Sequence, residues 1–136
     1  MIKIRELDHV VLRARDPDNM ISFYRDVLGC EVEKTQAQFG LYQLRAGSSL
    51  IDLVDVNGKL GRLGGAAPGD EGRNMDHFCL RVEPFNETEI LKHLASFGIS
   101  AAPAEPRYGA EGTGPSIYIV DPEDNVVELK GPPAIG

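Results

Sequence analysis

Hydrophobic and polar positions follow the same order twice along this chain. The segment Asp8–Arg13 (DHVVLR) recurs as Asp76–Arg81 (DHFCLR). In both copies a histidine follows the aspartate, and the apolar residues alternate with the period of a half-buried β-strand. A repeat of this kind predicts two structural modules of the same fold.

A helix is predicted after each copy of the strand. In the first half Asp16 is a candidate N-cap with Pro17 at the first helical position, and Gly29 stands where a C′ glycine ends a helix. In the second half Asn86 is the candidate N-cap, and Gly98 ends the apolar stripe. The two helices therefore occupy corresponding places in the repeat.

Three strand-like runs follow each predicted helix, because apolar and β-branched residues alternate with polar ones between Gly, Pro and Asp breakers. The runs lie near residues 30–35, 40–45, 49–55, 99–102, 116–120 and 125–130, with a long loop around 103–115. The late strands align as well: Tyr42 matches Tyr118, and Asp52 matches Glu128.

The predicted fold is thus α+β and consists of two βαβββ modules within one domain, residues 1–136. The first module covers about residues 5–56 and the second about 75–131. The glycine-rich linker at 57–74 has no apolar periodicity, and it is interpreted either as a connector or as a lid over a site.

Composition excludes several classes of function. The 136 residues are enough for one domain with its own core, and the net charge of -7 disfavours nucleic acid as a partner. No apolar run is long enough for a membrane span, and the N-terminus lacks a secretory signal, so a cytoplasmic protein is expected. Cys30 and Cys79 lie within apolar patterns and are expected to be buried and reduced.

Candidate metal ligands emerge from the repeat. His9 and His77 occupy the same position in the two copies, as do Asp52 and Glu128. Each carboxylate lies in mid-strand between apolar residues, where it is costly unless it is paired or bound to a metal. Imidazole and carboxylate ligands suit Ni, Zn, Co, Mn or Fe(II). The pattern predicts one divalent metal ion bound by these four side chains.

Other interpretations of the same residues remain open. Either histidine could simply be hydrogen-bonded within its strand, and Glu128 could be an edge charge. Asp52 could instead form a salt bridge with Arg13 or Arg81. As a ligand it could bind the metal directly or through water, because its side chain is one methylene shorter than that of glutamate.

Three longer motifs resemble the vicinal oxygen chelate superfamily, which comprises glyoxalase, bleomycin resistance proteins and extradiol dioxygenases. Its opening signature resembles Leu7–Leu12 followed by Phe23–Gly29. Its second module begins like Met75–Val82, and its closing hairpin is similar to Val120–Leu129. The resemblance covers nearly the whole chain.

This resemblance implies a fold, a cofactor and an assembly. Paired βαβββ modules would curl into a cup-shaped mixed β-sheet with helices on the outer face, around one divalent metal. The ligands carried over by position are His9, Asp52, His77 and Glu128, and the turn at Asp121–Asn125 would deliver Glu128. Members of the superfamily often form homodimers, which the resemblance therefore implies here too.

The resemblance also implies a class of reaction. A glyoxalase I-like lyase or isomerase would chelate neighbouring oxygens of a small substrate, and Glu128 or Asp52 would abstract a proton next to a carbonyl. A thiol such as glutathione could be the co-substrate. Alternatives are a metal-dependent thiol transferase, an Fe(II) extradiol-type dioxygenase, and a non-catalytic resistance-type protein that binds a small molecule.

Candidate substrate-binding residues follow from that chemistry. Arg13 and Arg81 recur on the face of the predicted ligands, and Arg107 offers a further cation for an anionic substrate. Tyr118 could donate a hydrogen bond to a substrate oxygen, although it could equally be a half-buried core tyrosine.

Overall fold

The computed structural model describes residues 1–134, so the last two residues of the predicted domain lie outside the description. The chain divides into two compact units, a first unit at Met1–Arg73 and a second unit at Asn74–Gly136. Each unit carries one four-stranded sheet. No helix among the described residues is long and apolar enough to cross a membrane.

The first unit has the βαβββ order. Its strands are ordered β1-β4-β3-β2 in the sheet, with β1 parallel to β4 and the other neighbours antiparallel. Its elements are β1 (His9–Ala14), α1 (Pro17–Ser22), the π-helical η1 (Phe23–Val27), β2 (Glu31–Gln36), the 3-10 turn η2 (Ala37–Phe39), β3 (Leu41–Ala46), β4 (Ser49–Asp55) and the 3-10 turn η3 (Gly61–Gly64).

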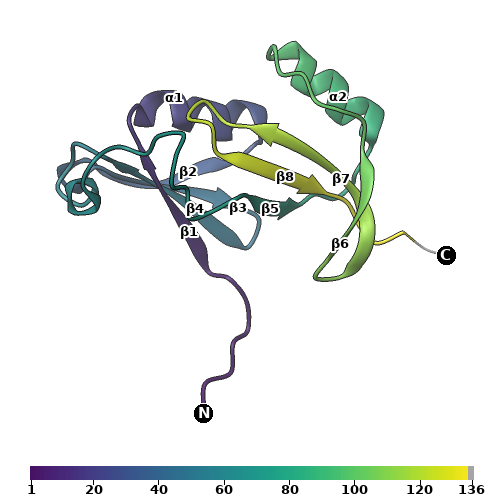
Figure 1. The fold of residues 1–136 in the computed structure, drawn as a ribbon, viewed down its shortest axis with the longest axis horizontal. Helices are drawn as coiled ribbons and strands as arrows, with labels where there is room; N and C mark the ends of the chain where they lie inside the picture. The colour runs from purple at the N-terminus through teal and green to yellow at the C-terminus, as the bar shows by residue number, and fades with distance from the viewer. Residues whose placement is uncertain (135–136) are drawn as a thin grey trace. The chain divides into compact units, whose positions relative to one another are not determined.

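The second unit repeats this topology, as the teal to yellow ribbon of Figure 1 shows. Its sheet order is β5-β8-β7-β6, again with one parallel pair, β5 and β8. Its elements are β5 (Phe78–Arg81), α2 (Glu87–Ser96), β6 (Glu105–Gly109), β7 (Gly112–Val120) and β8 (Val126–Lys130). The predicted α+β class with two βαβββ modules is confirmed.

The helix ends lie where the sequence predicted them. The Asp16 side chain accepts a hydrogen bond from the Asn19 backbone N–H at 3.1 Å, and Asn86 caps α2 in the same way at Glu89. Gly29 and Gly98 have φ of 76° and 75°, the left-handed conformation that glycine adopts without a steric penalty. The first helix departs from the prediction only in passing into a π-helical turn after Ser22.

Each sheet has one apolar face, which carries the core of its unit. In the first unit Leu44, Ile51 and Leu53 are fully buried together with Met20 and Tyr24 of the α1–η1 helix. The equivalent core of the second unit consists of Ile117, Ile119, Val127 and Leu129 in the strands and Leu94 in α2. Burying one such side chain contributes about 1.5–3 kcal/mol, so these faces stabilise the fold and the opposite faces are left for function.

The prediction for the early part of the second half was wrong. Residues 99–102 form no strand, and the expected loop around 103–115 is instead a hairpin made by β6 and β7. Its prolines suggested a loop, but Pro106 lies in β6, the edge strand of the sheet, opposite Pro115. An edge strand tolerates proline because the missing N–H has no ladder partner to satisfy.

The predicted match between Tyr42 and Tyr118 was wrong by one residue. Tyr118 lies opposite Glu128, whereas the residue opposite Asp52 is Gln43. Tyr42 lies opposite Leu53 and therefore points to the other face of its sheet. A slip of one residue in an alignment reverses the face of a strand residue, so the true counterpart of Tyr118 is Gln43.

The linker at 57–74 is more ordered than the prediction allowed. Its turn η3 approaches the end of β4 so closely that a Cβ on Gly61 would lie 1.8 Å from the Asp55 carbonyl oxygen. The Arg13 guanidinium of β1 donates to the carbonyls of Gly61, Gly65 and Ala66, at 2.6 to 3.1 Å. The linker is thus fastened to β1, and whether it also covers a site stays a prediction.

The cysteines differ from one another. Cys30 is buried as expected, but Cys79 is exposed, and both are free thiols. Cys79 alternates with Phe78 and Leu80 along β5, so it lies on the polar face of the sheet with His77 and Arg81.

Candidate metal and substrate site

In each unit, the histidine that occurs at the same position in both copies of the repeat lies next to the carboxylate of that unit. His9 Nε2 lies 4.0 Å from Asp52 Oδ2, and His77 Nε2 lies 3.2 Å from Glu128 Oε1. The pairing registers are equivalent, because the residue two positions after each histidine, Val11 or Cys79, lies opposite the carboxylate. The repeat that the sequence indicated therefore places the same two side chains in the same way twice.

An aspartate fixes the orientation of each imidazole. Asp8 Oδ2 lies 2.7 Å from His9 Nδ1, and Asp76 Oδ2 lies 2.7 Å from His77 Nδ1. The hydrogen bond to Asp8 raises the pKa of His9 above its ordinary value. With Nδ1 held in this way, Nε2 is directed at the carboxylate, the arrangement in which a histidine serves as a metal ligand.

Asp52 is buried and only partly satisfied. Its Oδ2 accepts a hydrogen bond from Gln43 Nε2 at 3.2 Å, but its Oδ1 is buried with no hydrogen-bond partner among the described residues. An unsatisfied buried carboxylate oxygen costs roughly 1–3 kcal/mol or more. A bound cation would offset this cost, so the donor chemistry of Asp52 and His9 fits a divalent ion.

Glu128 lies in the central part of the second sheet. The turn from Asp121 to Asn125 joins β7 to β8, with the Asp121 carboxylate accepting from the backbone N–H groups of Glu123 and Asn125 at 2.9 and 3.0 Å. In the sheet Glu128 is flanked by Cys79 and Tyr118. The Asp-Pro turn thus fixes the register that brings this carboxylate to His77.

The neighbours of Glu128 are held in their protonated forms. Partial loss of solvent around the thiol, followed by the Glu128 charge, raises the pKa of Cys79 to about 11, although the residue keeps some exposed surface. Partial desolvation and the same carboxylate also raise the pKa of Tyr118, whose ring stands edge-on to that of His77 at 5.3 Å between centroids. Tyr118 therefore keeps its O–H, a hydrogen-bond donor beside the carboxylate.

A cavity of about 320 Å³ opens on this face of the second unit. The His77 and Glu128 pair belongs to its wall, together with Arg81 of β5 and Glu111 of the β6–β7 turn. The rest of the lining consists of Cys79, Tyr108, Gly109, Ala110, Lys130, Gly131 and Pro133. A volume at the lower end of the range for ligand pockets fits a small molecule.

The arginines predicted to bind substrate have different surroundings. Arg81 lines the cavity, where its Nε donates to Glu111 at 2.8 Å and its Nη2 lies 3.3 Å from Glu83. The guanidinium of Arg107 lies over the Tyr118 ring, 4.4 Å from its centroid. Arg13 is occupied by the linker carbonyls, which leaves Arg81 as the cation within the cavity best suited to a substrate anion.

Neither unit holds a complete metal site by itself. Within residues 1–134 no group of three His, Cys, Asp or Glu side chains that could hold a metal ion is formed. Each unit supplies two of the four predicted ligands. Their combination in one site therefore stays a prediction.

Comparison with known proteins adds the family. A sequence model described as the Glyoxalase/Bleomycin resistance protein/Dioxygenase superfamily matches residues 6–129. The chain belongs to this superfamily. The match spans both units and all four predicted ligands, as the resemblance of the three motifs implied.

Two curated proteins of this kind are similar in sequence. A glyoxalase domain-containing protein of Mycosarcoma maydis is 32% identical over 129 residues, which cover 94% of this chain and 69% of that protein. The mitochondrial methylmalonyl-CoA epimerase of Mus musculus is 26% identical over 121 residues, which cover 86% of this chain and 66% of the epimerase. The chain spans about two thirds of the length of these relatives.

Solved structures share the fold. An integron cassette protein from Vibrio cholerae has a TM-score of 0.76 and 25% identity, and the match covers 96% of this chain and 98% of that one. A lactoylglutathione lyase from Agrobacterium tumefaciens has a TM-score of 0.66 and 22% identity, covering 93% and 92% of the two chains. The shared fold extends over almost all of this chain.

Sequence reasoning missed four residues that support this candidate site. Asp8 and Asp76 precede their histidines in both copies, and that repeated Asp-His pair was the signal that could have found them. Gln43 was missed because the two halves were aligned one residue out of register, which matched Tyr42 to Tyr118. Glu111 had no signal, because only the unpredicted β6–β7 hairpin brings it to Arg81.

Proposed function

We propose that this chain is a metal-dependent lyase or isomerase of the glyoxalase type that acts on a small molecule. Its metal ligands are His9, Asp52, His77 and Glu128. One observation carries this proposal: both units direct an aspartate-anchored imidazole Nε2 at a buried carboxylate. The partnerless Oδ1 of Asp52 supports it, because a cation would satisfy that atom.

A divalent ion, when bound, would act as a Lewis acid toward neighbouring oxygens of the substrate. The chain's own residues would handle the proton. Glu128 is the candidate base for a proton on the carbon next to a carbonyl, because it borders the cavity and is buried. Tyr118, which keeps its proton, would donate to a substrate oxygen, and Asp52 is the second candidate base.

Arg81 is the feature of the cavity that favours an anionic substrate. Arg81 offers its guanidinium at the cavity wall, and a substrate carboxylate could take the place of Glu111 beside it. Arg107 would not contact the substrate directly but would hold the ring of Tyr118 in place. Arg13 would likewise contribute only by holding the linker. The names of the relatives, a lactoylglutathione lyase and an epimerase, support proton transfer next to a carbonyl, with a thiol adduct as one substrate type.

The first test measures metal content. Protein purified without chelators is expected to contain about one equivalent of Ni, Zn, Co, Mn or Fe, and His77→Ala should lose most of it. His93→Ala is the matched control, because His93 is exposed on α2 away from the ligand strands. A wild-type protein that takes up none of these ions at any stoichiometry would refute the metal site.

The second test measures the reaction. Metal-loaded protein is offered the hemithioacetal of a 2-oxoaldehyde and glutathione, and isomerisation is followed by absorbance. Glu128→Gln should abolish turnover, whereas His93→Ala should not affect it. Metal binding without turnover would leave the metal site standing and reject the glyoxalase reaction.

A further inference from the structure

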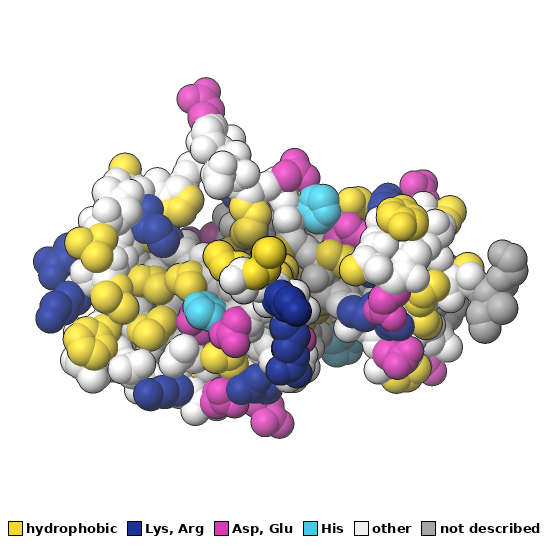
Figure 2. Space-filling model, turned by 90° about the horizontal axis from the view of Figure 1, so that it is seen from below, with side chains coloured by type: hydrophobic (Ala, Val, Ile, Leu, Met, Phe, Trp, Pro, Cys, Tyr) yellow, Lys and Arg dark blue, Asp and Glu magenta, His cyan; other side chains and the backbone are white. Residues whose placement is uncertain are grey.

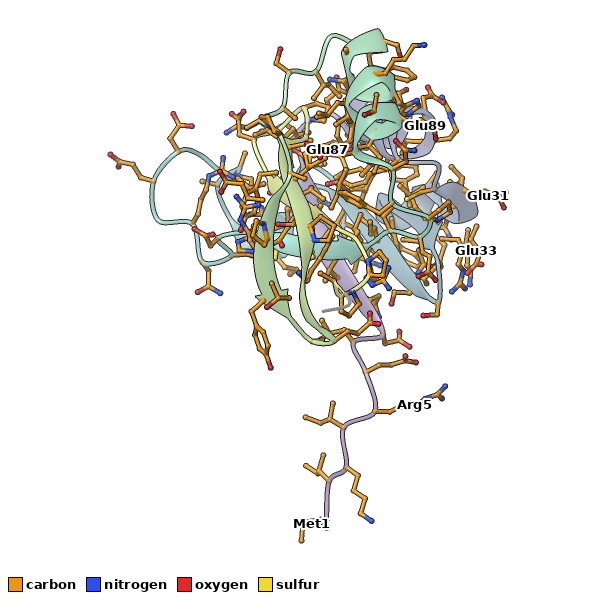
Figure 3. All side chains as sticks on the ribbon, turned by 90° about the vertical axis from the view of Figure 1, so that its right-hand side faces the viewer. Met1, Arg5, Glu31, Glu33, Glu87 and Glu89 are labelled. Carbon is orange, nitrogen blue, oxygen red and sulfur yellow. The ribbon has the colours of Figure 1, made fainter. Side chains whose placement is uncertain are left out.

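The first seven residues form an extended N-terminal arm that exposes large hydrophobic side chains. Met1, Ile2, Ile4 and Leu7 have relative exposures of 113%, 89%, 87% and 79%. Figure 3 shows the arm, with Met1 and Arg5 labelled, projecting from the sheet of its own unit. Unpartnered isoleucines at every second position are unfavourable in water, and they indicate a surface that becomes covered.

The arm has the pattern of a strand with two different faces. Ile2 and Ile4 alternate with Lys3 and Arg5, so an extended arm presents apolar side chains on one side and basic ones on the other. Figure 2 looks from the side toward which the arm extends in Figure 1, and hydrophobic and basic side chains lie together at the centre of that view. A strand of this kind needs an edge with an apolar face and an acidic face.

Strand β2 offers such an edge. It is the last strand in the order β1-β4-β3-β2, so its outer backbone groups have no ladder partner in the sheet. Five of its six residues are exposed, Val32 among them at 42%. The pairing with β3 shifts register between Val32 and Lys34, so the part of this edge that can serve as a template for another strand is its first half.

The two faces of β2 match the two faces of the arm. Val32 lies opposite Leu44 and therefore on the apolar side of the sheet. Glu31 lies opposite Arg45, and Glu33 forms an ion pair with Arg45 at 2.8 Å, so both carboxylates lie on the other side. Lys34, after a shift of register, lies opposite Gln43 on that same side, so the acidic stretch is limited to residues 31–33. Figure 3 labels Glu31 and Glu33, which both lie on the same side of the view.

We propose that the N-terminal arm of one copy of this chain pairs as an added strand with the β2 edge of a second copy. Ile2 and Ile4 then extend the apolar face beside Val32, and Lys3 and Arg5 face Glu31 and Glu33. Backbone hydrogen bonds supply affinity in strand addition, and the side chains supply specificity. The basic arm also offsets the repulsion between two chains that each carry a net charge of -7.

The arm does not suit the β2 edge of its own sheet. It enters the sheet at β1, the opposite edge, where Leu7 is held by the Ser49 hydroxyl at 3.2 Å. Crossing three strand spacings takes roughly 14 Å, whereas the three residues from Leu7 back to Ile4 span only about 10 Å when fully extended. Ile4 therefore cannot reach β2 of its own sheet, but it can reach the β2 edge of a second copy.

Cross-linking between differently tagged copies tests the contact. Ile4→Cys in one copy and Val32→Cys in the other are mixed, oxidised and examined by mass spectrometry for a disulfide between the two introduced thiols. Leu63→Cys mixed with Val32→Cys is the matched control, because Leu63 is equally exposed but lies in the linker. A yield several-fold above the control is expected. A yield at the control level overturns the proposal. So does a variant with both Ile4→Cys and Val32→Cys whose introduced disulfide forms only within single chains.

Analytical sedimentation of charge-removing variants tests whether the arm and β2 attract each other through their charges. Glu31→Gln with Glu33→Gln should weaken self-association roughly 3- to 10-fold, and so should Lys3→Gln with Arg5→Gln. Combining all four should cost no more than either pair alone, because both pairs remove the same contacts. The control is Glu87→Gln with Glu89→Gln on α2, which changes the net charge equally. Equal weakening by the control, or full additivity, overturns the proposal, whereas the proposed metal site is unaffected by either result.

Discussion

The two units share a backbone plan but use the same face of the sheet differently. Around Asp52 the first unit places Val11 on β1 and the amide of Gln43 on β3. Around Glu128 the second unit places Cys79 on β5 and Tyr118 on β7 at the equivalent registers. Both carboxylates are buried, but the one in the first unit has an oxygen without a partner among the described residues, whereas the pair in the second unit lies in the wall of a cavity with ionisable side chains.

The repeated arginine shows the same divergence. Arg13 and Arg81 occupy the same place in the repeat, yet Arg13 donates to linker carbonyls and Arg81 pairs with Glu111. A duplicated sequence therefore predicts the position of a side chain in its strand. Its hydrogen-bond partners depend on the loops, which are not duplicated. The first unit uses this arginine to hold the linker, and the second has it in the wall of the cavity.

The largest effects are expected in the two cores. Leu44→Ala in the first unit and Ile119→Ala in the second remove equivalent buried side chains, and each should lower the free energy of unfolding by about 2–5 kcal/mol. Urea denaturation measures this loss. Val32→Ala, on the same face as Leu44 but exposed, should cost less than about 1 kcal/mol. A similar cost at all three positions would contradict the division into buried and edge positions.

Both cysteines should react much more slowly than a cysteine thiol in an unfolded chain. With a pKa of about 11, Cys79 forms so little thiolate that a disulfide reagent at pH 8 should react roughly 100-fold more slowly than with an unfolded thiol. Because the pKa is raised, the rate should climb about tenfold per pH unit until the pH nears that value. Glu128→Gln removes a neighbouring negative charge and should accelerate the reaction. Cys30 should react only on unfolding, and rapid labelling of native Cys30 would show that the first core is open.

Next in size is the effect of the aspartates behind the histidines. Asp8→Asn and Asp76→Asn should each weaken metal binding by about 10- to 100-fold, because the Nδ1 anchor fixes the orientation of the imidazole. Competition with a chelating dye measures the affinity. Equal losses would show that both units supply a ligand. A loss at only one aspartate would assign the metal to that unit alone and would show that the two units do not contribute equally.

The smallest effect concerns the unpartnered oxygen. In metal-free protein Asp52→Asn should raise the free energy of unfolding by about 1 kcal/mol, because a neutral amide replaces a buried carboxylate whose Oδ1 has no partner. Glu128→Gln should give a smaller gain, since Glu128 already faces His77 at 3.2 Å. The urea midpoints of the two variants without metal provide the comparison. Destabilisation by Asp52→Asn would mean that the charge itself is favourable there.

Much of the site could be predicted from local pattern. The two helix caps and the Asp-Pro turn before Glu128 are short-range features, and the structure has each where the sequence predicts it. The repeated Asp-His dipeptide is short-range too, although the role of its aspartates was missed. Gln43 could not be found in this way, because a one-residue error in aligning β3 with β7 places the wrong side chain on the site face.

The sequence by itself determined the two βαβββ modules and the equivalence of His9 with His77 and of Asp52 with Glu128, because hydrophobic periodicity fixes which face a strand residue takes. Only the tertiary structure decided what surrounds these residues. Glu111 reaches Arg81 through a hairpin whose prolines suggested a loop, and Cys79 is exposed although its neighbours are apolar. Both depend on strand pairing over long stretches of chain, which sets contacts that no local pattern specifies.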